Sequence, residues 1–563
     1  MPVRVWTWLI ARRNTIGYSH KSGHKEFLRV LQYKSGGKDM KKRVKLTVLL
    51  ALTAALTACS GQPKNASTSA GAGEQPKTAE TSGREQTAGA DNSTLTVAYR
   101  TEAANLDPHN NQSLTAFSLE MLIYDRLVEK NPDGEIVPSL AESWEVLDDT
   151  TIRFHLREDV SFSNGEKLTA EDVKYTIERA ETMPNSSSFM KTFDGAGTTV
   201  VDEYTVDLKL HAPFAPVYNY LASARGSIVC KAEMERVGSD AYGRNPVGSG
   251  PMVFSQWVAG DRIELVRNEE YWGTKTAYEK FTARFIAEAS SREIELETGG
   301  VDVALHIASG DIARLEENPR TTVYNEPGYS QTMITMNQNT CPAFQDKRVR
   351  EAFYKALDIE GIGATIYGST AVPAYSIYPP AIMGYVQAGS DSYNPEEAKA
   401  LLDEAGFDYS QTFELMTTDD ATAISVCEAC KNMWNAVGIQ VEIVTYDQAT
   451  MTEKVNSGEY QMQLSSPSAS SGDPDHALYE WKSEVYGLNT PPEMMELITK
   501  GVQTYDAEER KQIYAEIQET GWNYYGELMI AFSNVTYGAS SRVQNLDVQP
   551  GSVPNFAGLT FSE

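Results

Sequence analysis

The chain has little cysteine, little basic charge and few long apolar runs, and each shortage excludes a class of protein. Only five of its 563 residues are cysteines, too few and too irregularly spaced for a disulfide framework. Lys and Arg number 49 against 77 Asp and Glu, a net charge of −28, which excludes binding of nucleic acid through phosphate neutralisation. No segment after residue 59 is apolar over the roughly 20 residues that a membrane-spanning helix needs.

Signatures of catalysis are also missing. The sequence has no G-x-S-x-G elbow, no G-x-x-x-x-G-K-[ST] phosphate loop and no H-E-x-x-H zinc site, and its seven histidines show no paired spacing. We therefore expect no metal, no cofactor and no enzymatic activity, although abundant acidic residues leave a glycosidase-type carboxylate pair open. Cys427 and Cys430 form a C-x-x-C pair, but residues three apart share one face of a helix. We interpret the pair as structural, with a redox or metal pair or an extracellular disulfide as the alternatives.

One apolar run near the N-terminus ends at a cysteine. A basic stretch, MKKRVK, precedes this run, and the run is too short to span a membrane. That order is typical of a secretory signal peptide, and the ending LTAC resembles a bacterial lipoprotein signal. The alternative is an ordinary signal peptide with an incidental cysteine. The resemblance predicts an upstream extension over 1–39, a true start at Met40, a signal peptide over 40–58 and lipidation of Cys59.

Residues 59–93 contain almost nothing large and apolar and are rich in Gly, Ser, Thr, Ala, Gln and Pro. This composition predicts a disordered tether. After residue 59 the chain has 37 basic and 75 acidic residues, a net charge of −38, so anionic lipid would not attract it. Attachment to a membrane would then depend on the lipid anchor.

Alternating apolar residues predict strands in the body that follows. Ile152, Phe154 and Leu156 alternate with polar residues, and the runs 204–210 and 438–444 repeat the pattern. Such strands lie among predicted helices, and no internal repeat is visible. The mixture predicts an α/β fold.

Helix signals are clearest between residues 394 and 406. Asn394 is the expected N-cap, Pro395 occupies the first helical position, Glu397 is expected to complete a capping box, and Gly406 ends the helix. The apolar stripe of this segment then faces a core. Two further helices with similar signals are expected, at 169–180 and 346–358.

Seven segments occur in an order that is specific as a set, although each alone is weak. They are ANLDPHNN (104–111), the stretch 123–180, the stretch 245–273 that begins NPVGSGP, the stretch 336–362 that begins MNQNTCPAF, YNPEEAKALLDEAGF (393–407), NAVGIQVEI (435–443), and the stretch 457–478 that ends SGDPDHAL. Together they resemble the peptide/nickel family, family 5, of the extracellular solute-binding proteins that serve ABC importers. The resemblance covers nearly all of residues 94–563.

The resemblance implies a two-lobed periplasmic-binding-protein-like fold (type II, cluster C-like) with a deep cleft and an extra inserted subdomain. Two chain crossings, near 328 and 525, would form a hinge about which the lobes close on ligand. The implied divisions are lobe I at 94–124, 245–328 and 526–563, an inserted subdomain at 125–244, and lobe II at 329–525.

The same resemblance implies a function. The protein would capture an oligopeptide or a similar small organic solute and deliver it to ABC permease subunits, as a monomer on the outer face of the cytoplasmic membrane or in the periplasm. A receptor for an oligosaccharide or a metal chelate within the same family, and a surface sensor without a transport role, are the alternatives.

Two loops are candidates for ligand contact. The turn that holds Gly248, Ser249 and Gly250 lets backbone approach a ligand closely, and the family has a similar turn at its cleft; a plain tight turn is the alternative. Arg100 and Glu102 follow the first predicted strand, where α/β ligand sites often lie. They would meet a charged end group, unless they are merely solvated.

The segment before Asp473 is the most informative. In peptide-binding members of the family an aspartate in this segment pairs with the peptide's α-amino group, and the resemblance places Ser470 at that position. Ser468 and Asp473, which lie nearby in the chain, are further candidates for ligand contact. A serine offers only a neutral hydrogen bond, whereas a carboxylate–ammonium pair is charge-assisted and about twice as strong. Standard capture of a free N-terminus is therefore in doubt. A blocked peptide, another cationic metabolite and an oligosaccharide remain open, and Glu102 is a candidate to supply the missing charge from the other lobe.

Overall fold

The structure is a computed structural model that describes residues 92–562, apart from residues 112, 132–133, 184, 187–189 and 552. The predictions for 1–39, 40–58 and Cys59, and nearly all of the tether at 59–93, lie outside the described residues. Within the described part of the chain, no helix is both long enough and apolar enough to cross a bilayer.

One sheet of eleven strands organises the body. At one end β1 (Thr94–Tyr99) lies parallel to β10 (Lys280–Phe285) and β11 (Val303–Leu305). Antiparallel β9 (Arg262–Arg267) and β8 (Met252–Val258) extend this end. The apolar residues of β1 are buried on both faces, as expected of a strand with parallel neighbours covered on each side.

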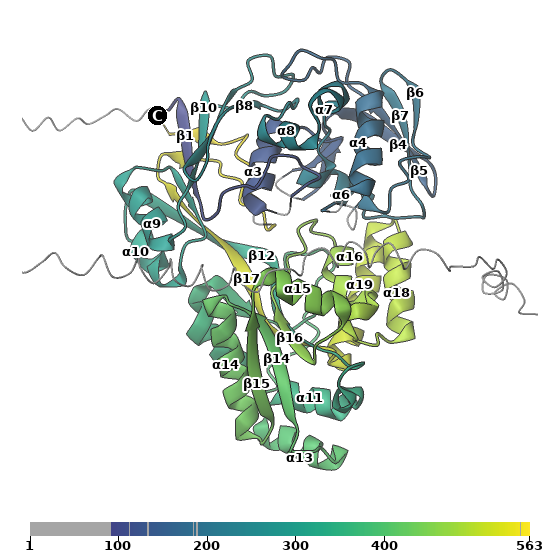
Figure 1. Cartoon of the computed structure of the whole chain (residues 1–563), viewed down its shortest axis with the longest axis vertical. Helices are drawn as coiled ribbons and strands as arrows, with labels where there is room; N and C mark the ends of the chain where they lie inside the picture. Colours follow the sequence, from purple (N-terminus) through teal and green to yellow (C-terminus); the bar gives the residue numbers. More distant parts are fainter. Residues whose placement is uncertain are drawn as a thin grey trace, which may run out of the picture. The chain divides into compact units, whose positions relative to one another are not determined.

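Two long antiparallel strands, β12 (Thr321–Met336) and β17 (Glu527–Ser540), carry the sheet to its other end (Figure 1). There β16 (Met462–Ser465), β14 (Thr412–Thr418) and β15 (Gln440–Tyr446) follow in that order, and the short β13 (Ala371–Pro373) pairs with β17. The crossing expected near 328 falls at a register shift between Pro327 and Ser330 of β12. The second passage lies within β17, between Ala531 and Val535, a few residues after the position expected near 525.

Two large hydrophobic cores lie on either side of this crossing. One is built from residues between 95 and 305 together with 535–559, and we call that part the first body. The other is built from residues between 334 and 531, and we call that part the second body. Because each body has its own core, a movement between them would expose little buried apolar surface.

Helices of the second body form where caps and apolar stripes predict them. Both α11 (Lys347–Lys355), capped by Asp346, and α13 (Pro395–Ala405) match the expected segments. The longer α14 (Ala421–Ala436) connects the parallel strands β14 and β15, as a βαβ crossover requires.

The capping box expected for α13 is wrong in its second half. The side chain of Asn394 accepts a hydrogen bond from the Glu397 N–H at 3.0 Å. The backbone N–H of Asn394, however, donates to the Lys355 carbonyl at 2.8 Å. Glu397 instead accepts a hydrogen bond from the Asn394 side-chain amide at 3.2 Å, because the neighbouring α11 already satisfies the backbone donor.

A separate four-stranded sheet lies within residues 125–244. Its order is β4 (Ala141–Asp148), β5 (Thr151–Leu156), β7 (Thr205–Lys209) and β6 (Thr199–Asp202). The predicted alternation is present, since Ile152, Phe154 and Leu156 are buried. The helix α4 (Ala170–Thr182) begins at a complete capping box of Thr169 and Asp172.

The remaining elements are shorter or peripheral, and Figure 1 labels many of them. The helices are α3 (Leu114–Ile123), α6 (Val217–Leu221), α7 (Lys231–Val237), α8 (Ser239–Arg244), α9 (Ala289–Thr298), α10 (Ile312–Glu316), α12 (Ile359–Ile362), α15 (Gln448–Ser457), α16 (Pro474–Ala477), α17 (Tyr479–Lys482), α18 (Pro492–Gln503) and α19 (Ala507–Tyr524). The strands are β2 (Val128–Lys130), β3 (Ile136–Pro138), β18 (Val543–Gln544) and β19 (Thr560–Phe561).

The C-x-x-C pair lies on the inner face of α14. Cys427 and Cys430 are both buried in the second body's core and carry free thiols. Burial raises the pKa of both thiols, which keeps them protonated and unreactive. The structural interpretation of the pair is consistent with this placement.

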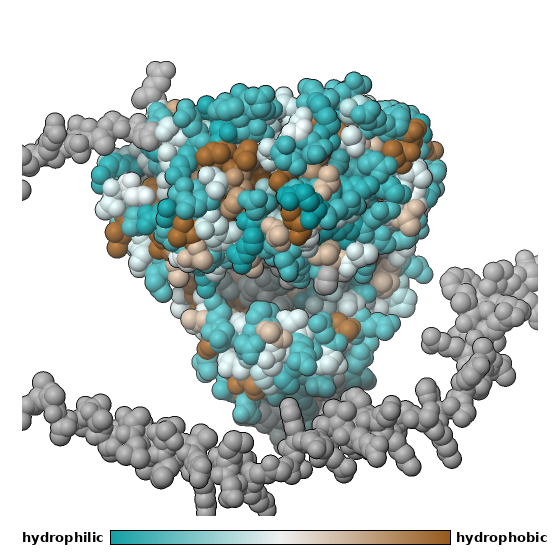
Figure 2. Space-filling model, turned by 45° about the horizontal axis from the view of Figure 1, so that its top comes forward, coloured by the Kyte–Doolittle hydropathy of each residue, from teal (hydrophilic) through white to brown (hydrophobic). Residues whose placement is uncertain are grey.

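The face of the molecule shown in Figure 2 is mainly hydrophilic, with hydrophobic residues in small separate patches. Scattered apolar side chains of this kind are normal on a protein surface. This face therefore carries no large continuous hydrophobic surface.

Candidate functional site

A cleft lies between the two bodies, and residues from well-separated stretches of the chain line it. The first body contributes α3, the segment around β2, the segment 219–225 and the loop 549–555, and the second body contributes the start of the region after β16. Tyr329, on β12, lies between them. The lining residues are Phe117, Met121, Arg126, Glu129, Lys130, Asn219, Ala222, Ser223, Ala224, Arg225, Tyr329, Ser470, Ser471, Gln549, Gly551, Val553 and Asn555.

Hydrogen bonds connect the two bodies at this cleft. Lys130 Nζ donates to the carbonyl oxygen of Ser471 at 2.7 Å. Asn219 Nδ2 donates to Asp473 Oδ2 at 2.9 Å. These two hydrogen bonds connect the walls of the cleft in the conformation of this structure. A ligand that enters the cleft must either leave these bonds in place or replace them with bonds of its own.

Asp473 is a structural anchor for this wall. It is fully buried, and Arg510 of α19 contacts it with both terminal nitrogens, at 2.7 and 2.8 Å. Its Oδ1 also accepts a hydrogen bond from the Asp475 N–H at 2.9 Å and so caps α16. Burial alone would raise the pKa of Asp473, but the Arg510 charge and hydrogen bonds lower it. Both carboxylate oxygens of Asp473 are thus engaged by protein groups.

The two predicted serines lie in different places. Ser470 lines the cleft. Ser468 instead forms a bridge to Ser330 of β12 and lines a separate hollow that also contains Gln331 and Glu480. The side chain at 470 is neutral, so the cleft has no carboxylate at that position.

Arg100 and Glu102 are not among the residues that line the cleft. Glu102 accepts hydrogen bonds from Trp257 Nε1 at 2.7 Å and from the Gly260 N–H at 3.0 Å. The loop after β1 therefore packs on the hairpin of β8 and β9, and Arg100 is exposed. The carboxylate expected to face Ser470 is held elsewhere by this hairpin.

The glycine-rich turn lies behind the cleft wall, against the end of α3. A Cβ at Gly248 would overlap the carbonyl oxygen of Ile123, and a Cβ at Gly250 would lie 2.6 Å from the same residue's carbonyl carbon. Ser249 is fully buried between them. Close packing gives these glycines a structural role, and it lets α3 present Phe117 and Met121 to the cleft.

Three basic side chains in the cleft wall were not singled out from the sequence. Arg126 NH1 donates to the Tyr124 carbonyl at 2.9 Å, and its NH2 donates to Glu129 at 2.7 Å. Arg225 lies over the Phe117 ring at 4.6 Å, and Lys130 bonds the opposite body. In a chain with an acidic excess, isolated basic residues give no local signal, so only the fold reveals that they meet.

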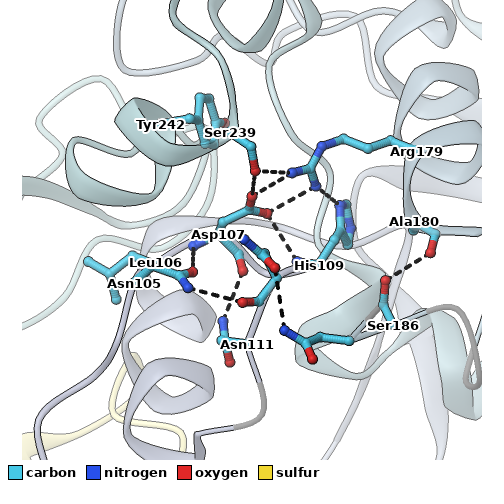
Figure 3. A network of polar contacts seen from close by, with 12 residues as sticks. Asn105, Leu106, Asp107, His109, Asn111, Arg179, Ala180, Ser186, Ser239 and Tyr242 are labelled. Atoms are coloured by element: carbon cyan, nitrogen blue, oxygen red, sulfur yellow. Dashed lines mark hydrogen bonds and ion pairs between the residues drawn. The ribbon is translucent and has the colours of Figure 1, made fainter. Parts of the chain in front are cut away.

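A buried polar network joins the loop after β1 to α4 and α8 (Figure 3). Arg179 of α4 contacts Asp107 at 2.5 and 3.0 Å and lies 2.7 Å from His109 Nδ1. Ser239 of α8 donates to the same carboxylate at 2.6 Å. The motif ANLDPHNN thus connects the loop after β1 to α4 and α8, which makes the 125–244 region one unit with the start of the chain's body.

Among the described residues, no three His, Cys, Asp or Glu side chains are grouped so that they could hold a metal ion. The cleft is lined by apolar, neutral polar and basic groups and by one carboxylate, that of Glu129. Such a mixture suits recognition of an organic molecule by packing and hydrogen bonding.

Fold and site together define a class: a two-lobed binding protein whose ligand cleft lies between its lobes. Residues 135–488, more than half of the chain, match the profile of bacterial extracellular solute-binding proteins, family 5. The chain belongs to this family, and it is a substrate-binding receptor of the kind that works with ABC transporters.

The similarity to individual relatives extends over most of both chains. The dipeptide-binding protein of Escherichia coli K12 is 28% identical over 476 residues, which cover 78% of this chain and 89% of that protein. Heme-binding protein A of Haemophilus influenzae is 26% identical over 480 residues, covering 78% and 86%. The structure of HbpA2 from Haemophilus parasuis superposes with a TM-score of 0.74 at 24% identity, covering 84% of this chain and all of that one.

Proposed function

We propose that this protein captures an oligopeptide or a similar small organic solute by closing its two bodies around it and delivers it unaltered to ABC permease subunits. The observation that carries this proposal is the cleft, whose walls come from both bodies and are joined by the bonds of Lys130 and Asn219 across it. A site that exists only where two bodies meet is suited to hinge closure.

The hinge in this proposal lies where the chain passes between the bodies. The register shift of β12 between Pro327 and Ser330 interrupts regular pairing with β17, and a bulge of this kind lets a strand bend. The second passage lies within β17, between Ala531 of the second body's core and Val535 of the first body's core, and faces the same register shift. The first position supports the division expected at 328, and the second lies a few residues after the division expected at 525.

The ligand class follows less directly from relatives, because those named above bind dipeptides in one case and heme in the other. An oligosaccharide or a metal chelate is the alternative within the family, and a sensor without a transport role is the alternative outside it. No described group of metal ligands favours a bare metal ion, and the apolar side chains of Phe117, Met121 and Val553 in the cleft favour an organic solute.

We further propose that Cys59 is lipidated after cleavage of residues 40–58, and that residues 59–93 tether a monomeric body outside the cytoplasmic membrane. The basic stretch, the apolar run and the cysteine in the sequence support this. A body with a strong acidic excess would gain little from anionic lipid headgroups, so the lipid would supply the attachment.

A thermal-shift screen of peptides, opines, polyamines, nickel chelates and oligosaccharides tests the function. A ligand at 100 times its dissociation constant stabilises the folded state by about 2.7 kcal/mol, which is readily measured. We expect one organic class to raise the melting temperature and mass spectrometry to recover that compound unchanged after release. Recovery of a converted product would contradict the proposal.

The variant Ser470→Asp tests the position where peptide-binding relatives carry an aspartate. The added carboxylate is expected to raise affinity for peptides with a free N-terminus, because it turns a neutral hydrogen bond into a charge-assisted pair. Binding is measured by calorimetry with a tripeptide and its N-acetylated form. Unchanged affinity for the free-amino tripeptide would show that residue 470 does not face the ligand's N-terminus.

A further inference from the structure

We infer that the turn between α18 and α19 latches the two bodies together at a point outside the cleft, and that this latch sets how tightly the cleft holds any solute. The latch is formed by Val502 and Tyr505 of the second body and by Asp149, Phe214 and Ala215 of the first body. We call the position in which these contacts form the closed position. The inference rests on the proposed function of the cleft and adds residues that control the cleft without lining it.

A backbone hydrogen bond is the shortest contact of the latch. The Ala215 N–H donates to the carbonyl oxygen of Val502 at 2.7 Å. Both groups belong to the main chain, and main-chain donors and acceptors need partners whether they lie in protein or in water. The bond joins residues of different bodies, so it can form only in the closed position.

The side chain of Val502 adds an apolar contact across the same junction. Val502 lies near the end of α18 in the second body, yet its side chain packs against the hydrophobic core of the first body. Separation of the bodies would return this side chain to water, which the hydrophobic effect opposes. The closed position is therefore favoured by packing that involves no cleft residue of the second body.

Tyr505 contributes two longer hydrogen bonds. Its hydroxyl oxygen accepts from the Phe214 N–H at 3.4 Å, and the hydroxyl donates to the carbonyl oxygen of Asp149 at 3.4 Å. Asp149 lies between β4 and β5, so one side chain of the second body contacts two separate loops of the 125–244 region. The tyrosine is 40% exposed, so its hydroxyl can be removed without disturbing a core.

Arg510 connects the latch to the cleft wall. Its Nε donates to the carbonyl oxygen of Gly501 at 2.9 Å, and its two terminal nitrogens hold Asp473. Asp473 in turn accepts the hydrogen bond of Asn219, which belongs to the first body and lines the cleft. The latch turn and the cleft wall are thus fixed to one side chain of α19, and we expect them to move together.

A latch outside the cleft favours closure without selecting among solutes. A solute that binds only the closed position has an apparent dissociation constant equal to its intrinsic one divided by the closed fraction. Loss of the latch lowers that fraction, so every solute should lose affinity by the same factor. A residue that contacts the solute would instead change some affinities more than others.

The first experiment measures the position of the bodies and needs no solute. Spin labels are attached to the full chain at Val201→Cys in the first body and Tyr393→Cys in the second, both at exposed positions. The chain also carries Cys59→Ala, and the other four cysteines are buried. Double electron–electron resonance between the labels gives the distribution of distances, and therefore the ratio of open to closed molecules.

Two variants then remove parts of the latch. We expect Val502→Ser to raise the ratio of open to closed molecules about threefold or more, as loss of one apolar contact implies, and Tyr505→Phe to raise it less. Gln503→Ala, which changes an exposed residue of the same turn, should leave it unchanged. A rise in either variant supports the latch, and Tyr505→Phe decides the test if Val502→Ser does not fold. An unchanged ratio in the variants that fold would overturn the inference.

The second experiment uses chemically different compounds that bind in the thermal-shift screen. Calorimetry should show that the latch variants weaken the binding of all of them by one common factor, with Gln503→Ala as the control. Unchanged affinities, or losses that differ between compounds, would overturn the inference. If no compound binds, the proposed function fails, whereas the distance measurement still decides whether the latch exists.

Discussion

At the scale of single residues, the glycines beside α3 are positions where an added Cβ atom would collide with the neighbouring backbone. Gly248 has no room for a side chain, because a Cβ would meet the backbone of Ile123, which cannot move independently of the helix. Its conformation is otherwise available to other residues. The requirement for glycine is therefore steric and comes from a neighbour more than 100 residues away in the chain.

Gly248→Ala is expected to destabilise the protein by about 1–3 kcal/mol, the usual effect of overpacking a tight site. The end of α3 would have to shift, and ligand affinity should fall with it because α3 lines the cleft. Chemical denaturation measures the first effect and calorimetry the second. Gly310→Ala is the matched control, since a Cβ there meets nothing within 4 Å; an equal loss in both variants would refute the steric explanation.

A second residue-scale prediction concerns Glu480. Thr335 donates to its carboxylate at 2.7 Å, and burial raises the pKa of Glu480 to about 7. A carboxyl group with a raised pKa binds its proton more tightly in the folded state than in the unfolded state. Its contribution to stability is complete below the unfolded pKa and is lost as pH rises through about 7.

Glu480→Gln should therefore flatten the pH dependence of stability. Relative to the variant, the wild type should lose unfolding free energy as the pH rises from 4.5 through about 7, because the charged form of Glu480 is disfavoured by burial. Denaturant unfolding at several pH values measures this. Glu508→Gln, at an exposed position, should leave the profile unchanged, and a wild-type profile parallel to that of Glu480→Gln would disprove the assignment.

At the scale of elements, the contact between α19 and the start of α16 fixes one wall of the cleft. Arg510 of α19 supports Asp473 at the start of α16, and Asn219 of the first body contacts the same carboxylate. The Arg510–Asp473 ion pair thus connects α19 to the surface where the two bodies meet. Its removal should affect both the stability of the second body and closure.

Arg510→Met should cost about 3–5 kcal/mol in stability, because it leaves the Asp473 carboxylate buried without its cation. The double variant Arg510→Met, Asp473→Asn should recover much of that loss, since no charge remains to be compensated. Melting and denaturation curves of the three proteins test this. A double variant as unstable as the single one would show that packing, and not the buried charge, dominates.

At the scale of the whole molecule, the prediction concerns attachment. Cys59→Ala removes the residue proposed to be lipidated, and the protein is expected to leave the membrane fraction of its native host and appear in the soluble extracellular or periplasmic fraction. Cys230→Ala is the control, because that thiol is buried in the body. Fractionation and mass measurement of the mature N-terminus provide the test; unchanged membrane association of Cys59→Ala would contradict the anchor.

Two strands, β12 and β17, are shared by the two hydrophobic cores, and this sharing concerns the whole molecule. Since β12 and β17 belong to both bodies, the proposed closure would require bending within these two strands. The buried network of Asp107 and Arg179 keeps the 125–244 region with the first body. A ligand therefore meets two units, and not three independent ones.

The sequence by itself determined the local elements and the family. Alternation placed β5 and β7, caps placed α11 and α13, and an ordered set of segments predicted the solute-binding class, because each of these signals depends on residues close together in the chain. Even there, the neighbouring helix α11 altered the cap of α13 by bonding the Asn394 N–H.

Only the tertiary structure decided which side chains form the cleft. Lys130 and Ser471 lie 341 positions apart, and no local pattern announces that they meet. Glu102 was a reasonable ligand candidate from its place after β1, but Trp257 of a later hairpin binds it. The charge of a buried site depends on which side chains converge there and on how completely water is excluded. Both are set by contacts between residues that lie far apart in the chain.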